Sequence, residues 1–456
     1  MHNDSKKTSE ILIDVDRYAT YEELRTSTAD NDGCGTRVYT TDLEVRKDGL
    51  VSVDEANRLV LPPGVIEGFG IEPGVRLRFV EHENRLEIYP SIHSLAKLYI
   101  EPTSRCNLSC QTCIRNTWEE PMGDMDIGLF NKIIDQISNF PALRTVMLGG
   151  FGEPTFHKDI VYMIAQLKSV GMNVEMTSNG TLLSEEMMIG LIQSGLDTLW
   201  ISFDGTSVES FNDIRSGAHF EALVQRLCRF KALNVQSSHK VKVGIAFVVL
   251  KKNIHELKNL PRLAHRIGAV RIAISNVLPY SEDMLEQMVC DRVVGGVHTS
   301  PHEIKLPLIN LDEDSIGPLA ELLRSSNNIS IMGYRMPVLS DSCRFIRERC
   351  TFIRWDGIVS PCMGLLHSYK TYFPADKLER EIKNYSVGDL KEKRLKDIWD
   401  CREYRDFRDS VDSFDYSPCL YCGHCNMSQT NEEDCYGNNL PSCGGCLWAQ
   451  GVIQCP

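Results

Sequence analysis

The sequence predicts an α/β protein in which a parallel sheet with flanking helices lies between a small β-rich N-terminal domain and a cysteine-rich C-terminal domain. Apolar runs and helical patterns alternate over residues 95–280, as strands and helices do in such a sheet. Residues 38–92 instead contain short strand patterns broken by turns. Eleven of the 17 cysteines fall between residue 343 and the end, which sets this part apart from the rest.

The central segment has six apolar runs, each predicted to be a strand. They lie at 98–103, 144–150, 172–177, 197–203, 242–250 and 269–276. The helical patterns between them lie near 127–139, 158–170, 184–194, 219–233 and 254–267. This alternation predicts a parallel sheet with right-handed crossovers, and its five crossovers are too few for a closed eight-fold barrel. Chemistry is expected at the C-terminal ends of the strands.

The composition of the 456-residue chain is typical of a globular protein with two or three domains. Its net charge of −13 argues against binding to nucleic acid or anionic membranes, which requires a basic surface. No apolar run reaches the roughly 18 residues that span a bilayer, and the polar N-terminus lacks the apolar core of a secretory signal. We therefore expect a cytoplasmic protein, whose dense cysteines serve as metal ligands rather than disulfides.

The N-terminal part is predicted to contain two regions. Residues 1–36 are polar and uneven, as in a flexible tail. The strand and turn order of residues 38–92, with Gly-Ile-Glu-Pro-Gly at 70–74, resembles an AbrB-like swapped-hairpin domain. The resemblance implies a dimerisation or docking module, with a homodimer through this domain in the first case, and a plain β-rich extension is the alternative. Six Lys/Arg against ten Asp/Glu over residues 38–90 argue against DNA binding by this unit.

Three cysteines with C-x3-C-x2-C spacing follow the first predicted strand of the central segment. They are Cys106, Cys110 and Cys113. Iron–sulfur clusters are usually held by four thiolates, so three close thiolates can hold a 4Fe–4S cluster and leave one iron open. An open metal position is what separates a reactive site from a structural one. The alternatives are a zinc knuckle or three buried thiols.

This segment resembles the cluster loop of the radical S-adenosylmethionine (SAM) enzymes. In that family the open iron binds the amino and carboxylate groups of SAM, and an electron from the cluster cleaves SAM to a 5′-deoxyadenosyl radical. The resemblance implies that residues 95–280 form a radical SAM core, a partial (β/α)6 TIM-like barrel. It also implies reduced ferredoxin or flavodoxin as the electron donor.

The resemblance also implies a set of SAM-binding residues at the ends of the predicted strands. They are Gly149, Gly150, Gly152, Glu153, Ser178, Asn179, Ser202, Asp204 and Arg215. Glycines let the backbone approach a ligand, short polar side chains can bind ribose hydroxyls, and a guanidinium suits a carboxylate. The alternatives are ordinary turn chemistry and, for Arg215, a surface arginine.

The cysteine pattern from Cys343 onward resembles the SPASM extension of radical SAM maturases, which carries two auxiliary 4Fe–4S clusters. The candidate ligands are Cys343, Cys350, Cys362, Cys419, Cys422, Cys425, Cys435, Cys443, Cys446 and Cys455. The resemblance gives the barrel-proximal cluster Cys343 or Cys350, with Cys362 and Cys446. It gives the distal cluster two or three of Cys419, Cys422 and Cys425, with Cys443 and Cys455. Cys425 and Cys435 depart from the commonest spacing, and four-thiolate zinc sites are the alternative.

Residues 281–342 are predicted to bridge the barrel to residues 343–456, with a helix from Asp312 to about Ser325 and a strand at Asn327–Met332. The whole pattern resembles the tungsten-cofactor oxidoreductase radical SAM maturases. That resemblance implies an enzyme that helps to mature a tungstopterin-dependent oxidoreductase. A maturase acting on a ribosomal peptide or protein is the first alternative. A non-catalytic iron–sulfur electron carrier is an alternative of another class.

Overall fold

The computed structural model of the chain describes residues 90–289, 343–373, 377–417, 419 and 425–453, with shorter stretches between 52 and 89 and residues 314, 317 and 329–331. The chain divides into two compact units, Met1–Ser94 and Leu95–Pro456. The predicted tail and most of the predicted bridge, including nearly all of its helix, lie outside the described residues.

The first unit contains two antiparallel strand pairs. Strand β1 (Ser52–Val53) pairs with β2 (Leu59–Val60), and β3 (Arg78–His82) pairs with β4 (Arg85–Tyr89). The second pair coincides with two of the predicted strands. Phe79 of β3 is 65% exposed. A hairpin of two strands alone is only marginally stable in water.

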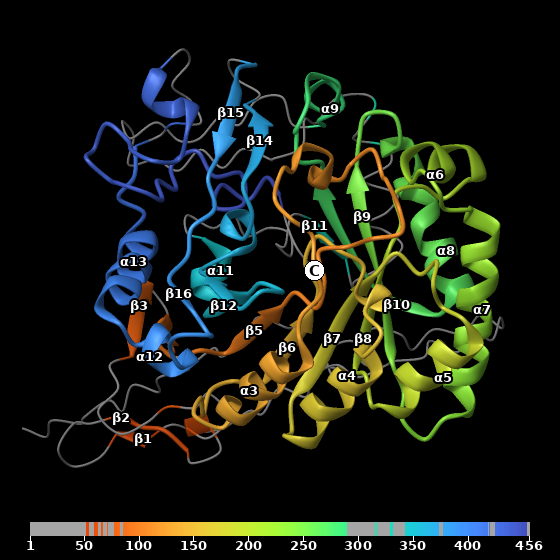
Figure 1. The fold of residues 1–456 in the computed structure, drawn as a ribbon, viewed down its shortest axis with the longest axis horizontal. Coiled ribbons are helices and arrows are strands. Elements are labelled where there is room, and N and C mark those ends of the chain that lie inside the picture. Colours follow the sequence, from red (N-terminus) through yellow and green to blue (C-terminus); the bar gives the residue numbers. More distant parts are fainter. Residues whose placement is uncertain are drawn as a thin grey trace, which may run out of the picture. The chain divides into compact units, whose positions relative to one another are not determined.

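The second unit is built on a ten-stranded sheet with the order β11-β10-β9-β8-β7-β6-β5-β12-β13-β16 (Figure 1). Its parallel centre consists of β5 (Lys97–Ile100), β6 (Thr145–Leu148), β7 (Asn173–Ser178), β8 (Thr198–Ser202), β9 (Lys242–Val249) and β10 (Ala269–Asn276). All six predicted strands are therefore present. The predicted strand near residue 330 is β11 (Ile329–Ile331), which pairs parallel with β10.

Helices connect these strands. They are α3 (Ile127–Ile137), α4 (Ile160–Ser169), α5 (Glu185–Gln193), α6 (Val208–Ile214), α7 (Phe220–Gln236), α8 (Leu260–Ile267) and α9 (Glu282–Glu286), with 3₁₀ turns η1 (Ile114–Thr117), η2 (Pro154–Phe156) and η3 (Ile254–Asn259). The short helix α6, capped by the Ser207 hydroxyl, was not predicted. The last predicted helix is divided between η3 and α8, where Pro261 occupies the first turn of α8.

No helix among the residues described here is long and apolar enough to cross a membrane.

The C-terminal part extends the same sheet. Strand β12 (Cys350–Ile353) pairs parallel with β5, in register from Cys350 opposite Lys97 to Ile353 opposite Ile100. The remaining elements are α11 (Arg344–Arg347), β13 (Ile358–Ser360), η4 (Met363–Leu365), β14 (Tyr369–Tyr372), β15 (Glu379–Ile382), β16 (Gly388–Asp389), α12 (Leu395–Trp399), α13 (Arg402–Ser413) and η5 (Asn426–Gln429). Tyr99 of β5 stacks on Phe352 of β12 with ring centroids 4.2 Å apart. The C-terminal domain is thus joined to the barrel by backbone pairing and by a buried aromatic contact.

Candidate active site

A cavity of about 380 Å³ opens at the C-terminal ends of the parallel strands. Eleven of the twelve residues predicted for the cluster and SAM line it: Cys106, Cys110, Cys113, Gly149, Gly150, Gly152, Glu153, Ser178, Asn179, Ser202 and Arg215. Arg344, Met363, Trp448 and Ile453 of the C-terminal domain also line it. The fold therefore brings together residues that lie more than 100 positions apart in the sequence.

The three cysteines of the cluster loop lie between β5 and η1. Cys106 Sγ accepts a hydrogen bond from the Leu108 backbone N–H at 3.4 Å, and Asn179 Nδ2 lies 3.7 Å from the same sulfur. Burial raises the pKa of the Cys110 thiol to about 11. Only thiolates bind iron. The cysteines can therefore act as ligands when the bound metal stabilises their deprotonated sulfurs and offsets this rise in pKa.

Arg115 is a part of this site that the sequence patterns did not indicate. Its Nε donates to Cys113 Sγ at 3.4 Å, and its Nη2 donates to the Leu108 carbonyl at 2.9 Å. One guanidinium therefore holds the loop closed and places a positive charge beside the thiolates. Hydrogen bonds to cluster sulfurs are one means by which proteins set reduction potential. The only sequence signal was a basic residue two positions after the third cysteine.

The glycine turn after β6, Gly149–Glu153, packs directly against the protein backbone. A Cβ atom added to Gly152 would lie 2.0 Å from the Thr103 carbonyl oxygen, and one added to Gly150 would lie 2.7 Å from Glu101 Oε1. The Glu153 N–H also donates to the Arg105 carbonyl at 2.8 Å. These glycines are therefore needed for close approach to the neighbouring β5 segment, in addition to any approach to a ligand.

Glu153 is buried and ties the glycine turn to the end of β7. Its Oε1 accepts from Ser178 Oγ at 2.7 Å and from the Thr155 backbone N–H at 3.1 Å, and the Thr155 hydroxyl also donates to it. Its Oε2 accepts from the Asn179 N–H at 2.6 Å. Burial raises the pKa of Glu153, against the opposing effect of these hydrogen bonds. Glu153 thus lines the cavity and also links the glycine turn to the end of β7 through hydrogen bonds.

Asp204 is the one residue of the predicted set that is fully buried and does not line the cavity. Its Oδ2 lies 2.9 Å from Arg215 Nε, and its Oδ1 accepts from the Val248 N–H at 3.1 Å. Arg215 does line the cavity. We infer that Asp204 orients Arg215 and does not contact the ribose. Strand-end position alone could not show that the Asp204 side chain turns back towards β9.

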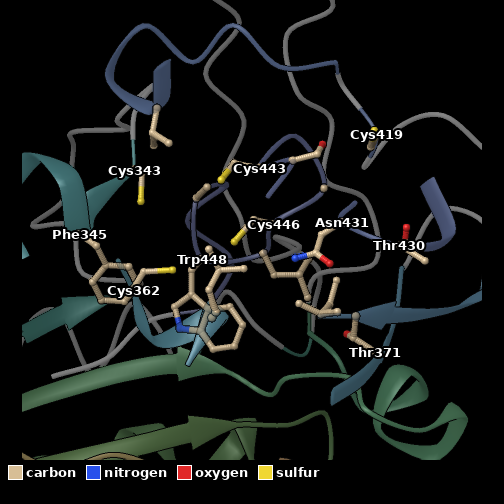
Figure 2. A pocket seen from close by; sticks show the side chains of 18 of the residues that line it. Cys343, Phe345, Cys362, Thr371, Cys419, Thr430, Asn431, Cys443, Cys446 and Trp448 are labelled. Atoms are coloured by element: carbon tan, nitrogen blue, oxygen red, sulfur yellow. The ribbon is translucent and has the colours of Figure 1, made fainter. Parts of the chain in front are cut away.

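A second cavity, of about 40 Å³, lies in the C-terminal domain and is lined by Cys343, Cys362, Cys419, Cys443 and Cys446. Figure 2 shows four of these sulfurs near one another, with Cys419 apart from them. Burial raises the pKa of the Cys343 thiol to about 12, and the nearby Cys446 adds to this rise. Metals bind thiolates, so a metal centre here would have to offset this rise in pKa by stabilising the deprotonated sulfurs.

This arrangement differs from the assignment that the resemblance implied. Cys443, assigned to the distal cluster, lies with Cys343, Cys362 and Cys446. Cys350 belongs to β12 and is fully buried, but it is not part of the cavity lining. Cys435 is exposed and Cys425 precedes η5, whereas Cys422 and Cys455 lie outside the described residues. We propose that Cys343, Cys362, Cys443 and Cys446 hold one auxiliary cluster.

Four-thiolate zinc is the alternative to a cluster at these cysteines. No three His, Cys, Asp or Glu side chains in the described part of the chain are arranged to hold a single metal ion. The thiolates of a four-iron cluster bind different irons, so their sulfurs lie farther apart than those around one zinc ion.

Replacement of single cysteines should distinguish the two assignments. With three clusters, the anaerobically reconstituted protein should hold about twelve irons per chain. Cys443→Ala should lower this number by about four, because it removes a proposed ligand of the first auxiliary cluster. Cys350→Ala, the matched buried control, should leave the iron content unchanged. Iron and sulfide analysis checks both, and a loss of iron from Cys350→Ala alone would contradict the proposed ligand set.

Comparisons with known proteins agree with this architecture. Residues 100–264 match the family model of the radical SAM superfamily, and residues 343–426 match that of an iron–sulfur cluster-binding domain, SPASM. The chain is 32% identical over 375 residues to the "Tungsten-containing aldehyde ferredoxin oxidoreductase cofactor-modifying protein" of Pyrococcus furiosus, a match that covers 79% of this chain and 96% of that protein.

Other relatives are more distant. The chain is 28% identical to Fe-coproporphyrin III synthase of Methanosarcina barkeri, over 72% of this chain and 80% of that protein. It is 29% identical to PqqA peptide cyclase of Granulibacter bethesdensis, over 40% and 47%. Among solved structures, Streptococcus suis SuiB bound to S-adenosylmethionine has a similar fold, with a TM-score of 0.51 and 18% identity over 72% of this chain and 71% of that one. The chain therefore belongs to the radical SAM superfamily and is an enzyme whose radical SAM domain binds a 4Fe–4S cluster and SAM and whose SPASM domain binds further iron–sulfur clusters.

Proposed function

We propose that this enzyme cleaves SAM reductively at the cluster held by Cys106, Cys110 and Cys113, and that it acts in maturing a tungstopterin-dependent oxidoreductase. The observation that carries the first part is the shared cavity, which places three thiolates beside a glycine turn and an oriented arginine. The relationship to the Pyrococcus furiosus protein supports the second part. When bound, the reduced cluster and SAM supply a 5′-deoxyadenosyl radical.

The residues of the chain bind and orient the cofactor. In this proposal the glycine turn and Glu153 bind the amino group of SAM, and Arg215, which lies against Asp204, binds the carboxylate. Ser178, Asn179 and Ser202 supply short polar side chains to the same cavity, suited to ribose hydroxyls.

The C-terminal domain closes the substrate side of the cavity. Arg344, Met363 and Trp448 of this domain line the cavity, and Trp448 also lines the auxiliary cysteine cavity. Excluding water and stray C–H groups matters here, because a primary carbon radical reacts with almost any nearby hydrogen. We propose that the substrate enters at this boundary and that ferredoxin or flavodoxin supplies the electron.

The test uses the anaerobically reconstituted full chain, chemically reduced in the presence of SAM. Formation of 5′-deoxyadenosine, followed by mass spectrometry, is the expected result, and its absence would overturn the first part of the proposal. For the second part, a tungsten aldehyde oxidoreductase is produced in cells with and without this chain. Equal cofactor mass and activity in both preparations would contradict a maturase role while leaving SAM cleavage standing.

A peptide-modifying role is the second candidate. The match to PqqA peptide cyclase favours it, although that match spans less than half of either chain. A short peptide encoded beside this protein and modified by it in vitro would support this role. The N-terminal hairpin with exposed Phe79 supports a homodimer through that unit, which the mass of the protein in solution would test.

A further inference from the structure

A buried histidine lies between two carboxylates where the C-terminal domain contacts the barrel. His367 Nε2 is 3.0 Å from Glu101 Oε2, and His367 Nδ1 is 2.9 Å from Glu120 Oε2. The His367 and Glu101 side chains are 1% and 0% exposed. These three residues, here named the His367 triad, have no role in the proposed handling of SAM, so their burial calls for a separate explanation.

The geometry favours a protonated His367. Between two ionised carboxylates, which only accept hydrogen bonds, both ring nitrogens must donate, and only the protonated ring has two N–H groups. Burial alone would lower the pKa of His367, but Glu101 and Glu120 together raise it. Arg354 Nη1, 3.2 Å from Glu120 Oε2, balances the second carboxylate. Trp118 stacks on the imidazole ring with centroids 4.1 Å apart and shields it from water.

Glu101 also contacts the glycine turn of the cavity. Its Oε1 accepts a hydrogen bond from the Phe151 N–H at 3.3 Å, and the Gly150 backbone packs against its carboxyl group. The Phe151 ring meets Trp118 edge to face, with centroids 5.4 Å apart. The Glu101 carboxylate, which His367 contacts, therefore also contacts Gly150 and Phe151 in the middle of the glycine turn.

The triad joins three distant segments. Glu101 directly follows β5, Glu120 follows η1 and the cluster loop, and His367 lies between η4 and β14, five residues after Cys362. We propose that His367 is a positioning residue through which the C-terminal iron–sulfur domain, by way of Glu101, holds the SAM-binding glycine turn in place. This inference rests on the proposed function, because it takes the turn to be part of the SAM site.

Two substitutions separate the arms of the triad. The amide of His367→Gln places a donor near the position of Nε2 and can keep the bond to Glu101. The amide of His367→Asn places a donor near the position of Nδ1 and can keep only the bond to Glu120. Both lose the positive charge, and His367→Asn also loses one methylene more of packing than His367→Gln does. His239→Asn, a histidine bonded to the Leu196 carbonyl in the same barrel, is the control.

The first measurement is SAM affinity in the reconstituted protein, by equilibrium dialysis. His367→Asn should weaken it about tenfold or more, the size usual for coupling between sites, while His367→Gln and His239→Asn stay within about threefold of the wild type. The second is hydrogen exchange without SAM. The amides of residues 149–153 should exchange faster in His367→Asn than in His367→Gln, because support of the turn by Glu101 is lost.

The outcomes are distinct. Equal affinities and equal exchange for the two His367 variants would overturn the proposal and leave the triad a structural ion cluster. Should the wild type bind no SAM, the proposed function fails, while the exchange comparison still tests whether His367 supports the turn. If His367→Asn does not fold, slower exchange of the turn in wild type than in Glu101→Gln still supports the link, and unchanged exchange contradicts it.

Discussion

Cys110→Ala is expected to abolish SAM cleavage while leaving the auxiliary clusters in place. Two remaining cysteines cannot hold a four-iron cluster, so the open iron that would bind SAM is lost. The loop itself should persist, because the Gln111 N–H donates to the Ile214 carbonyl at 2.8 Å and Arg115 bridges the loop from Cys113 to Leu108. The measurements are 5′-deoxyadenosine yield and iron content, which should fall by about four irons per chain.

The control for this variant is Cys228→Ala. Cys228 lies in α7, where its thiol donates to the Arg266 carbonyl at 3.7 Å and packs against the edge of the hydrophobic core, away from the cluster loop. This variant should keep wild-type iron content and cleavage. Undiminished 5′-deoxyadenosine formation by Cys110→Ala would show that the radical chemistry does not depend on the C-x3-C-x2-C loop.

Glu153→Ala is expected to weaken SAM binding by more than tenfold and also to destabilise the barrel. The substitution leaves the buried donors of Ser178, Thr155 and Asn179 without their acceptor. Each unsatisfied buried donor costs about 1–3 kcal/mol, so we expect the free energy of unfolding to fall by about 3 kcal/mol or more. SAM affinity by dialysis and the thermal unfolding temperature of the reconstituted protein measure the two effects, and the iron content should remain that of the wild type.

Glu153→Gln separates the two effects. It keeps the volume of the side chain and one acceptor oxygen, but its amide nitrogen faces the Asn179 N–H in place of Oε2. We expect a smaller fall in unfolding temperature than for alanine, with a clear loss of SAM affinity. Glu185→Ala is the surface control, since the Glu185–Arg229 ion pair is half exposed and such pairs contribute little. Wild-type SAM affinity in Glu153→Ala would contradict the role of this carboxylate.

The fold and the first part of the site could be predicted because their signals are local. Apolar strand segments alternate regularly with helical segments along the sequence. The cluster loop and the glycine turn have residue spacings that occur in few other kinds of structure. Helix α6 was missed because seven residues are too few to show a helical period. Arg115 and His367 were missed because each is a single residue, with no spacing to mark it.

The ligands of the auxiliary clusters could not be assigned from the sequence, for a different reason. Cys350 and Cys343 stand seven positions apart, so spacing could not choose between them. The choice depends on the pairing of β12 with β5, which places Cys350 opposite Lys97. It also depends on the chain near Cys443, which returns to the cavity lined by Cys343. Both are long-range events that follow from packing. The direction of the Asp204 side chain shows the same limit, because its tertiary contacts with Arg215 and with the Val248 N–H of β9 fix it.

The parallel pairing of β12 with β5 has a practical consequence for anyone dividing this protein into fragments. A recombinant piece ending before β12 would leave β5 as a bare outer strand, with unpaired backbone groups ready to recruit another polypeptide. Such a piece should precipitate during expression even if its iron could be loaded. The catalytic half is therefore obtainable only with the cluster-rich half attached.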